Sequence, residues 1–184
     1  MVADPDVETC TKCPELVACR TKIVNGRGDP SANLALVGEA PGRFEDETGV
    51  PFVGRSGELL DEALVDLGVD PAMVRITNCV RCRPPDNRNP RVGERQNCRG
   101  HLDTELEAID PSVVLTLGRV PTQELLGEPI TVTELVGEVR ELPIAGSTRQ
   151  LVIGLHPAAT LYDRTKRPAF EEALTRAIEL AGLY

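Results

Sequence analysis

The sequence contains very few aromatic residues and no long apolar run. Tryptophan is absent, and there are only three phenylalanines and two tyrosines among the 184 residues. No apolar stretch approaches the roughly 20 residues that a membrane-spanning helix needs, which argues against an integral membrane protein. The first six residues lack the basic and apolar regions of a secretory signal peptide, so we expect a cytoplasmic protein whose cysteines stay reduced.

Lysine is also scarce, and acidic residues outnumber basic ones. Only three of the 20 basic residues are lysine, and 29 acidic residues bring the net charge to −9. Acid excess with few lysines suggests an organism adapted to high salt, a hypothesis that equal stability in dilute buffer and in concentrated KCl would contradict. The charge is unevenly spread, because residues 81–100 carry six arginines and only two acids. One basic surface on an acidic body is compatible with local phosphate binding.

Residues 37–57 form a stretch rich in glycine and proline. It holds five glycines and two prolines and follows an apolar run, 34–37, that predicts a short buried strand. Glycine lets the backbone approach a ligand closely, and proline stiffens its path. We therefore expect a loop shaped to hold a small planar or anionic group. The alternative is an ordinary surface loop with turn residues.

Apolar strands and amphipathic helices alternate along the rest of the chain. The pattern predicts strands over 34–37, 75–80, 112–117 and 150–155, helices over 56–67, 94–109, 121–126 and 167–180, and paired edge segments within 130–144. Ser56 is the expected N-cap of the first helix. Such alternation favours one α/β domain whose parallel sheet is covered on both faces. Ligands bind beyond the carboxyl ends of such strands, so the glycine-rich loop, the arginine-rich loop and His156 should share one rim.

Four of the six cysteines have the spacing of a metal site. Cys10 and Cys13 form a Cys-x-x-Cys pair, in which two thiolates reach one metal from a single turn. Cys82 lies in the arginine-rich loop and Cys98 in the helix that follows. Four thiolates from these segments would close a site that clips the N-terminal segment, 1–33, onto the domain. Zinc and an iron–sulfur cluster both accept four cysteines, so both stay open at this point.

Three other side chains are unusual for their positions. His156 stands between a buried strand and a proline at the expected rim, where its alternative role is to cap a helix. Asn78 lies in a predicted strand, which asparagine disfavours, and its amide offers a donor and an acceptor side by side for reading a nucleobase edge. Phe52 lies in the glycine-rich loop, where it could anchor the core or stack on a base, an interaction worth about 1–3 kcal/mol.

Several motifs together carry a family resemblance: Gly38-Glu-Ala-Pro-Gly42, Glu45-Asp46, Gly49-x-Pro-Phe-Val-Gly54, Thr77-Asn78, Cys82-Arg-Pro-Pro-x-Asn-Arg-x-Pro90 and His156-Pro-Ala. They resemble the iron–sulfur uracil-DNA glycosylases, family 4 of that superfamily, and the match covers nearly the whole chain. The resemblance implies a single domain, 1–184, with a three-layer α/β/α fold around a four-stranded parallel sheet. It also implies a [4Fe–4S] cluster held by Cys10, Cys13, Cys82 and Cys98.

The resemblance further implies a reaction and the residues that perform it. A repair glycosylase of this kind flips uracil out of DNA and hydrolyses its N-glycosidic bond, leaving an abasic site without a lyase step. Phe52 would stack on the base, Asn78 would pair with O4 and N3–H, and His156 would donate to O2 of the leaving anion. Backbone amides would help to hold the base at Gly38, Ala40 and Gly42.

The water-activating residue is less clearly marked. By resemblance, the superfamily's usual aspartate falls at Ala40, which cannot accept a proton. Glu39 is the favoured substitute, and Asp46 is the other candidate, although its side chain could simply order the loop. The loop bearing Arg83, Arg88 and Arg91 is expected to grip DNA phosphates. This loop has no histidine of the kind that captures the sugar covalently in some relatives, so we expect ordinary turnover.

Two alternatives from other classes remain at this point. A nucleotide-phosphate-binding module would use the glycine-rich loop as a cradle, but the loop lacks the Gly-Lys-Ser/Thr ending of a P-loop. A non-catalytic iron–sulfur DNA-binding protein would leave Asn78 and His156 without a role. The expected partner is uracil-containing DNA, single- or double-stranded, bound by a monomer. A sliding clamp is a candidate protein partner.

Overall fold

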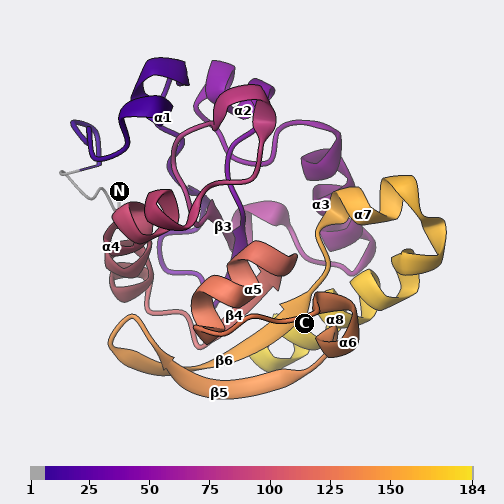
Figure 1. The fold of residues 1–184 in the computed structure, drawn as a ribbon. Coiled ribbons are helices and arrows are strands. Elements are labelled where there is room, and N and C mark those ends of the chain that lie inside the picture. Colours follow the sequence, from indigo (N-terminus) through magenta and orange to yellow (C-terminus); the bar gives the residue numbers. More distant parts are fainter. Residues whose placement is uncertain (1–6, 184) are drawn as a thin grey trace.

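The computed structural model describes residues 7–183 and shows a six-stranded mixed sheet with helices on both faces (Figure 1). The strand order is β1-β3-β2-β4-β6-β5. The bounds are β1 Arg27–Gly28, β2 Leu34–Gly38, β3 Arg75–Asn78, β4 Val113–Leu117, β5 Val139–Ile144 and β6 Ser147–Gly154. The central strands β3, β2, β4 and β6 are mutually parallel, whereas β1 and β5 run antiparallel at the two edges.

The predicted α/β architecture is confirmed, but the predicted strand number is wrong. The four expected strands form the parallel centre of the sheet, and two edge strands extend it to six. β5 joins through a tight hairpin in which Ala145 and Gly146 both have positive φ, as hairpin turns require. β1 is only two residues long, too short to produce an alternating pattern in the sequence. The predicted edge pairing within 130–144 is confirmed for β5, but its partner is β6, and residues 132–135 are helical.

The helices mostly begin within two residues of the predicted positions. The α-helices are α1 Pro14–Cys19, α2 Arg43–Thr48, α3 Arg55–Asp66, α4 Val92–Ile109, α5 Arg119–Leu126, α6 Val132–Leu135, α7 Pro157–Tyr162 and α8 Arg167–Ala181, with 3₁₀ turns η1 Pro71–Met73, η2 Pro85–Asn87 and η3 Arg164–Lys166. The predicted cap Ser56 is wrong, because Gly54 is the N-cap of α3. Within residues 7–183, none of the helices has the length and apolar character needed to cross a membrane.

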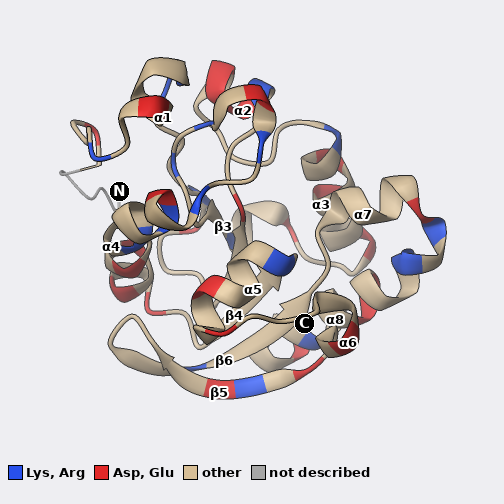
Figure 2. Ribbon diagram, viewed as in Figure 1, with Lys and Arg blue, Asp and Glu red and all other residues tan. Residues whose placement is uncertain are grey.

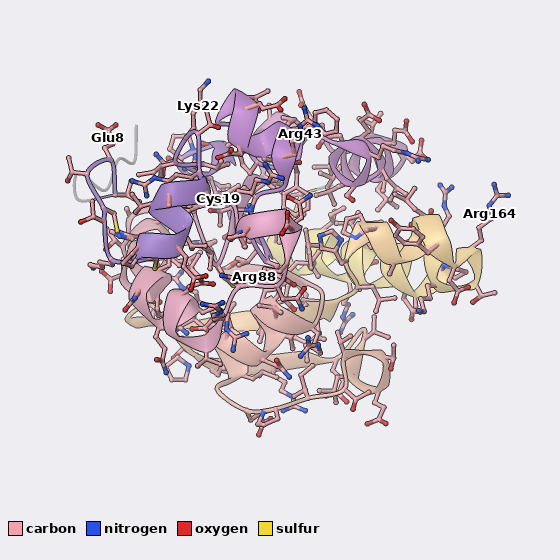
Figure 3. The ribbon with its side chains drawn as sticks, turned by 45° about the horizontal axis from the view of Figure 1, so that its top comes forward. Glu8, Cys19, Lys22, Arg43, Arg88 and Arg164 are labelled. Atoms are coloured by element: carbon pink, nitrogen blue, oxygen red, sulfur yellow. The ribbon has the colours of Figure 1, made fainter. Side chains whose placement is uncertain are left out.

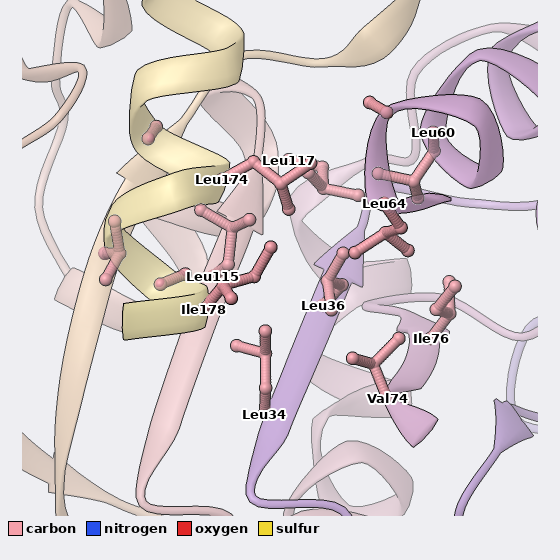
Figure 4. Packing of buried hydrophobic residues seen from close by; sticks show 14 of the residues in the cluster. Leu34, Leu36, Leu60, Leu64, Val74, Ile76, Leu115, Leu117, Leu174 and Ile178 are labelled. Carbon is pink, nitrogen blue, oxygen red and sulfur yellow. The ribbon is translucent and has the colours of Figure 1, made fainter. Parts of the chain in front are cut away.

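Alternate residues of each central strand pack into two hydrophobic cores, one on each face of the sheet. In β2, Leu34 and Leu36 pack with α3 and α8 on one face, as Figure 4 shows for Leu60, Leu64, Leu174 and Ile178. Ala35 and Val37 face the other side, where Leu102 and Leu106 of α4 cover the sheet. Successive side chains of a strand point to opposite faces, so a strand buried on both sides reads as a continuous apolar run. This arrangement confirms the three α/β/α layers.

The parallel strands bring four loops to one rim of the sheet. Gly38 ends β2 and is in register with Asn78, the last residue of β3. The Gly118 N–H donates to the Gly154 carbonyl at 3.0 Å, which joins the segments following β4 and β6. Gly118 has φ +105°, and a Cβ added there would lie 3.1 Å from the Cβ of His156. The glycine-rich loop follows β2, the arginine-rich loop follows Asn78 at the end of β3, and His156 follows β6, so these three lie at one rim as predicted.

Candidate functional site

A cavity of about 180 Å³ opens at this rim. Its lining comes from the glycine-rich loop, from the end of β3 and from the start of α7, and consists of Ala40, Gly42, Glu45, Phe52, Ser56, Asn78 and His156. A larger cavity, of about 620 Å³, lies between the segment before β5 and α8, and none of the predicted site residues lines it. The chemically distinctive side chains therefore converge on the smaller cavity.

Phe52 is held in place by two glycines that leave room for it. Its φ of +54° lies in the left-handed region, which is costly for a bulky side chain, and the residue is 7% exposed. A Cβ at Gly38 would lie 2.6 Å from Cζ of the Phe52 ring, and one at Gly57 would lie 2.0 Å from the Phe52 carbonyl oxygen. The ring stacks against His156 with 5.9 Å between centroids. These glycines are therefore required for the shape of the cavity wall.

Asn78 presents an amide to the cavity that the protein itself leaves unused. The residue is 3% exposed and ends β3 beside Gly38. Within residues 7–183, its side chain makes no hydrogen bond to the chain, although buried polar groups are nearly always paired. The amide therefore has both a donor and an acceptor available for a ligand.

His156 is fixed in one tautomer by its position at the start of a helix. It is the N-cap of α7, and its Nδ1 accepts the backbone N–H of Ala158 at 3.1 Å. A neutral imidazole with Nδ1 as acceptor carries its proton on Nε2. Burial lowers the pKa of His156, and the nearby Glu45 carboxylate only partly opposes this. At neutral pH the ring is therefore an uncharged donor through Nε2–H, so the capping role and a role in the cavity are compatible.

Glu45 is the acidic side chain in the cavity, and sequence reasoning did not single it out. Its Oε2 accepts the N–H of Gly42 at 3.1 Å, while Oε1 accepts the N–H groups of Val53 at 3.2 Å and Gly54 at 3.1 Å. One carboxylate thus ties the beginning of α2 to the beginning of α3. The only sequence signal was its place in the quoted motif, because nothing in the pattern shows which of three successive acids turns inward.

The two carboxylates predicted to position water lie outside the cavity lining. Asp46 is 2% exposed and accepts backbone N–H groups from Thr21, at 2.8 and 3.0 Å, and from Lys22, at 3.2 Å. It therefore fastens the N-terminal segment to α2. Glu39 is half-buried, and burial raises its pKa, with Arg119 and Arg95 partly offsetting the effect. Its electrostatic neighbours Arg119 and Arg95 belong to α5 and α4.

The arginine-rich loop is largely neutralised by acids of the same chain. Arg88 forms a two-point contact with Glu94, at 2.7 and 2.9 Å, and reaches Glu15 at 3.3 Å. Arg91 is paired with the other oxygen of Glu15. Arg83 has no acidic partner within residues 7–183 and donates to Asn87 at 2.7 Å. The local excess of positive charge predicted for residues 81–100 is therefore reduced by Glu15 of α1, a residue remote in sequence.

Cysteines from three segments gather beside this loop. The Cys82 and Cys98 thiols are buried, which raises their pKa values, that of Cys98 to about 11, and Cys10 lies within electrostatic reach of both. Cys13 also lies within electrostatic reach of Cys10 and Cys82. The Arg20 guanidinium donates to the Cys82 sulfur at 3.1 Å. In the described part of the chain, no group of three or more His, Cys, Asp or Glu side chains is arranged to hold a metal ion.

Comparison with known proteins gives a consistent result. A sequence model of the uracil DNA glycosylase superfamily matches residues 25–179. The type-4 uracil-DNA glycosylase of Archaeoglobus fulgidus is 39% identical over 181 residues, covering 96% of this chain and 90% of the relative. That of Sulfurisphaera tokodaii is 38% identical, covering 96% and 82%. The type-5 uracil-DNA glycosylase of Thermus thermophilus is 30% identical, covering 95% and 94%.

Proposed function

The chain belongs to the uracil-DNA glycosylase superfamily and to its type-4 group, and from this premise we propose that it excises uracil from DNA through the cavity at Asn78 and His156. The reaction is hydrolysis of the N-glycosidic bond: the bond from C1′ to N1 breaks and its electron pair leaves with the base. A water oxygen bonds to C1′ and gives up a proton, and the uracil anion takes up a proton. The product is an abasic site, the substrate of later repair steps.

The observation that carries this proposal is the unused amide of Asn78 at the base of the cavity. Uracil presents an acceptor, O4, beside a donor, N3–H, and the asparagine amide offers the complementary pair. Cytosine presents a donor at N4 and an acceptor at N3, so it would pair only with the amide turned by 180°, and the discrimination rests on the amide keeping the orientation that uracil requires. Rejecting a ligand that leaves buried polar groups unpaired gives strong discrimination. Asn78 is therefore the proposed residue that recognises uracil.

Phe52 and the small size of the cavity suit a single flipped base. Flipping costs a few kcal/mol, less for a mispaired or single-stranded uracil. Stacking on an aromatic ring contributes about 1–3 kcal/mol per base, which offsets part of that cost. The cavity volume of about 180 Å³ is below the roughly 300–1,000 Å³ of sites for drug-sized ligands. Backbone groups of Gly38, Ala40 and Gly42 complete the proposed wall around the base.

His156 is the proposed donor to the leaving base. Its Nδ1 is occupied by the Ala158 N–H, so the Nε2–H is the donor that the ring has available. Negative charge develops on the uracil as the bond breaks, and a hydrogen bond to O2 stabilises that charge. One donor placed in this way contributes about 3–4 kcal/mol, or about 10²–10³ in rate.

We propose Glu45, in preference to Glu39 or Asp46, as the carboxylate that positions the attacking water. A carboxylate has about four lone-pair sites, and three backbone N–H groups occupy sites on Glu45. One site is left for a water beside the sugar. Glu39 does not line the cavity, and Asp46 is committed to the N-terminal segment. The variants Glu45→Gln and Glu39→Gln separate the two carboxylates, since only the first should slow excision at saturating DNA.

The four cysteines are the proposed ligands of a [4Fe–4S] cluster, consistent with membership of the type-4 group. The donor chemistry suits a cluster, although no three of these side chains are arranged around a metal ion in the described residues: Cys10 and Cys13 precede α1, Cys82 lies in the arginine-rich loop and Cys98 in α4. N–H donors of Arg20 and Asn97 point at the Cys82 and Cys13 sulfurs. A cluster bound here would act structurally, since hydrolysis transfers no electrons. These residues would hold α1 against α4, in the position where Glu15 meets Arg88 and Arg91.

The test is base release from an oligonucleotide that contains one uracil, followed by alkaline cleavage of the abasic site. We expect a cut at uracil and none with thymine or cytosine at that position. Asn78→Asp and His156→Ala should lose at least about 10² in rate, while Asn89→Asp, at an exposed residue, should keep the rate of the parent. Absence of cutting by the folded parent protein would refute the proposed function. Full activity of both site variants would refute the proposed residues.

Three further expectations remain predictions. Size-exclusion chromatography should show a monomer. If a sliding clamp is a partner, mixing the two proteins should shift their elution. If the protein is cytoplasmic, fractionated cells should contain it in the cytoplasmic fraction and not in the membrane fraction.

A further inference from the structure

The arginines of this protein divide into two classes by their partners. All 17 arginines lie within residues 7–183. Twelve form ion pairs with acids: Arg27, Arg43, Arg75, Arg81, Arg88, Arg91, Arg95, Arg99, Arg140, Arg149, Arg167 and Arg176. In the described part of the chain, five form no ion pair with an acid: Arg20, which faces the Cys82 sulfur, and Arg55, Arg83, Arg119 and Arg164, of which Arg119 lies within electrostatic reach of Glu39.

The last four arginines lie in the segments that follow the carboxyl ends of the parallel strands. Arg55 opens α3 and directly precedes Ser56, which lines the cavity. Arg119 follows Gly118, the residue that packs against His156. Arg83 lies in the loop after β3, and Arg164 begins η3, directly after the helix that His156 caps. Each therefore follows the carboxyl end of a different parallel strand.

We propose that Arg55, Arg83, Arg119 and Arg164 bind backbone phosphates of the DNA strand on both sides of the flipped uridine. The inference rests on the proposed function, because it places the strand across the mouth of the cavity. It also reassigns the arginine-rich loop: Arg88 and Arg91 hold α1 through Glu15, and only Arg83 of the predicted set faces phosphate. An arginine already paired with a carboxylate must give up that contact to bind a phosphate, whereas these four need not.

The span of the four arginines matches several nucleotides. α7 has six residues, and an α-helix rises about 1.5 Å per residue, so Arg164 stands about 9 Å or more from His156. Phosphates follow one another at about 3.4 Å along the axis of each strand, which places Arg164 near the second or third phosphate from the flipped nucleotide. Figure 3 shows Arg164 projecting from the molecule at the far end of the α7–α8 segment. Tyr162, 91% exposed, lies just before it and offers a surface for a neighbouring base.

The charge on the rest of the surface favours the face that carries these four arginines as the site where DNA binds. With a net charge of −9, most of the body repels a polyanion. Figure 2 shows acidic and basic residues interspersed along most of the ribbon, with basic residues at the connection between α7 and α8. A phosphate contact releases a counterion, so each one adds about 0.7 to the salt slope of log K for single strands and about 0.9 for duplexes. The salt slope therefore reports the number of arginine–phosphate contacts separately from the repulsion between the DNA and the acidic remainder of the protein surface.

The experiment measures binding and excision together for matched variants. Arg55→Gln, Arg119→Gln and Arg164→Gln are compared with Arg140→Gln and Arg167→Gln, whose arginines are paired with acids. The probe is a fluorescein-labelled oligonucleotide with one central abasic-site analogue, titrated by anisotropy. Each of the first three should bind about five- to eightfold more weakly at 0.1 M salt, with the difference closing toward 1 M, and lose about one unit of salt slope. The loss in excision rate should be larger at limiting DNA than at saturating DNA.

Two results would overturn the inference. One is an unchanged salt slope in all three variants, and the other is an equal loss in the paired controls. The outcomes also separate this inference from the proposed function. If the parent excises uracil while the three variants bind like the controls, the phosphate contacts are refuted and the glycosylase assignment stands. If the variants lose slope but the parent never releases uracil, the strand-binding face stands and the glycosylase assignment fails.

Discussion

Replacing Gly38 by alanine tests whether the cavity depends on a missing side chain. The added Cβ would lie 2.5 Å from Oδ1 of Asn78 and between 2.6 and 2.7 Å from the Phe52 ring. Carbon atoms attract best at about 3.5–4.0 Å, so both neighbours must move outward by about 1 Å. These neighbours are the two side chains proposed to recognise the base. The single added methyl group should therefore disturb both the proposed pairing of Asn78 with the base and the proposed stacking of Phe52 on it.

The cost can be estimated for stability and for activity separately. Overpacking a well-packed site costs about 1–3 kcal/mol, which lowers Tm by about 2–12 °C for a domain of this size. A displacement of about 1 Å in a positioning group costs about 10² in rate. We therefore expect Gly38→Ala to remain folded at 25 °C while losing about 10² or more in kcat/KM for uracil release.

Gly100 provides the matched control. It lies inside α4, and a Cβ there would meet nothing within 4 Å. Alanine is favoured over glycine in a helix by about 0.5–1 kcal/mol, so Gly100→Ala should raise Tm slightly and leave excision unchanged. Thermal unfolding and base release are measured on both variants. Near-parent kcat/KM in Gly38→Ala would refute the reasoning, because the cavity would then tolerate the displacement.

Three other perturbations have defined expectations. Burial would raise the pKa of Glu105, but Arg81, Arg75 and Thr77 hold it below its usual value. Glu105→Gln should therefore lower the free energy of unfolding by about 3–5 kcal/mol, measured with urea at pH 7. Because the pKa of the folded protein is depressed, this loss should shrink as pH falls through that pKa. Because the pKa of His156 is lowered, the excision rate should fall only below that lowered value, where the protonated ring loses its Nδ1 acceptor. The pH profile of His156→Ala should lack this fall on the acidic side. Asp46→Ala removes the acceptor for Thr21 and Lys22, so limited proteolysis should cut the N-terminal segment faster than in the parent, at a cost of about 1–3 kcal/mol.

The sequence by itself determined the central strands, the larger helices and most of the cavity. Continuous apolar runs marked the strands buried on both faces, and parallel order then placed their carboxyl ends at one rim. Phe52, Asn78 and His156 were identifiable because each residue type was unusual for its local setting. Gly38 and Gly42 were marked by the density of glycine. Such signals are local, so they survive without any knowledge of the packing.

Only the tertiary structure decided which charged groups are available. The three acids Glu45, Asp46 and Glu47 are adjacent, yet the first lines the cavity, the second fastens the N-terminal segment and the third pairs with Arg43. A helix turns each successive side chain by about 100°, so neighbours in sequence face different surroundings. Arg88 and Arg91 were predicted to bind phosphate, but Glu15, more than 70 residues away, occupies them. Charge compensation across the fold depends on such distant pairs, and no local pattern of residues records them.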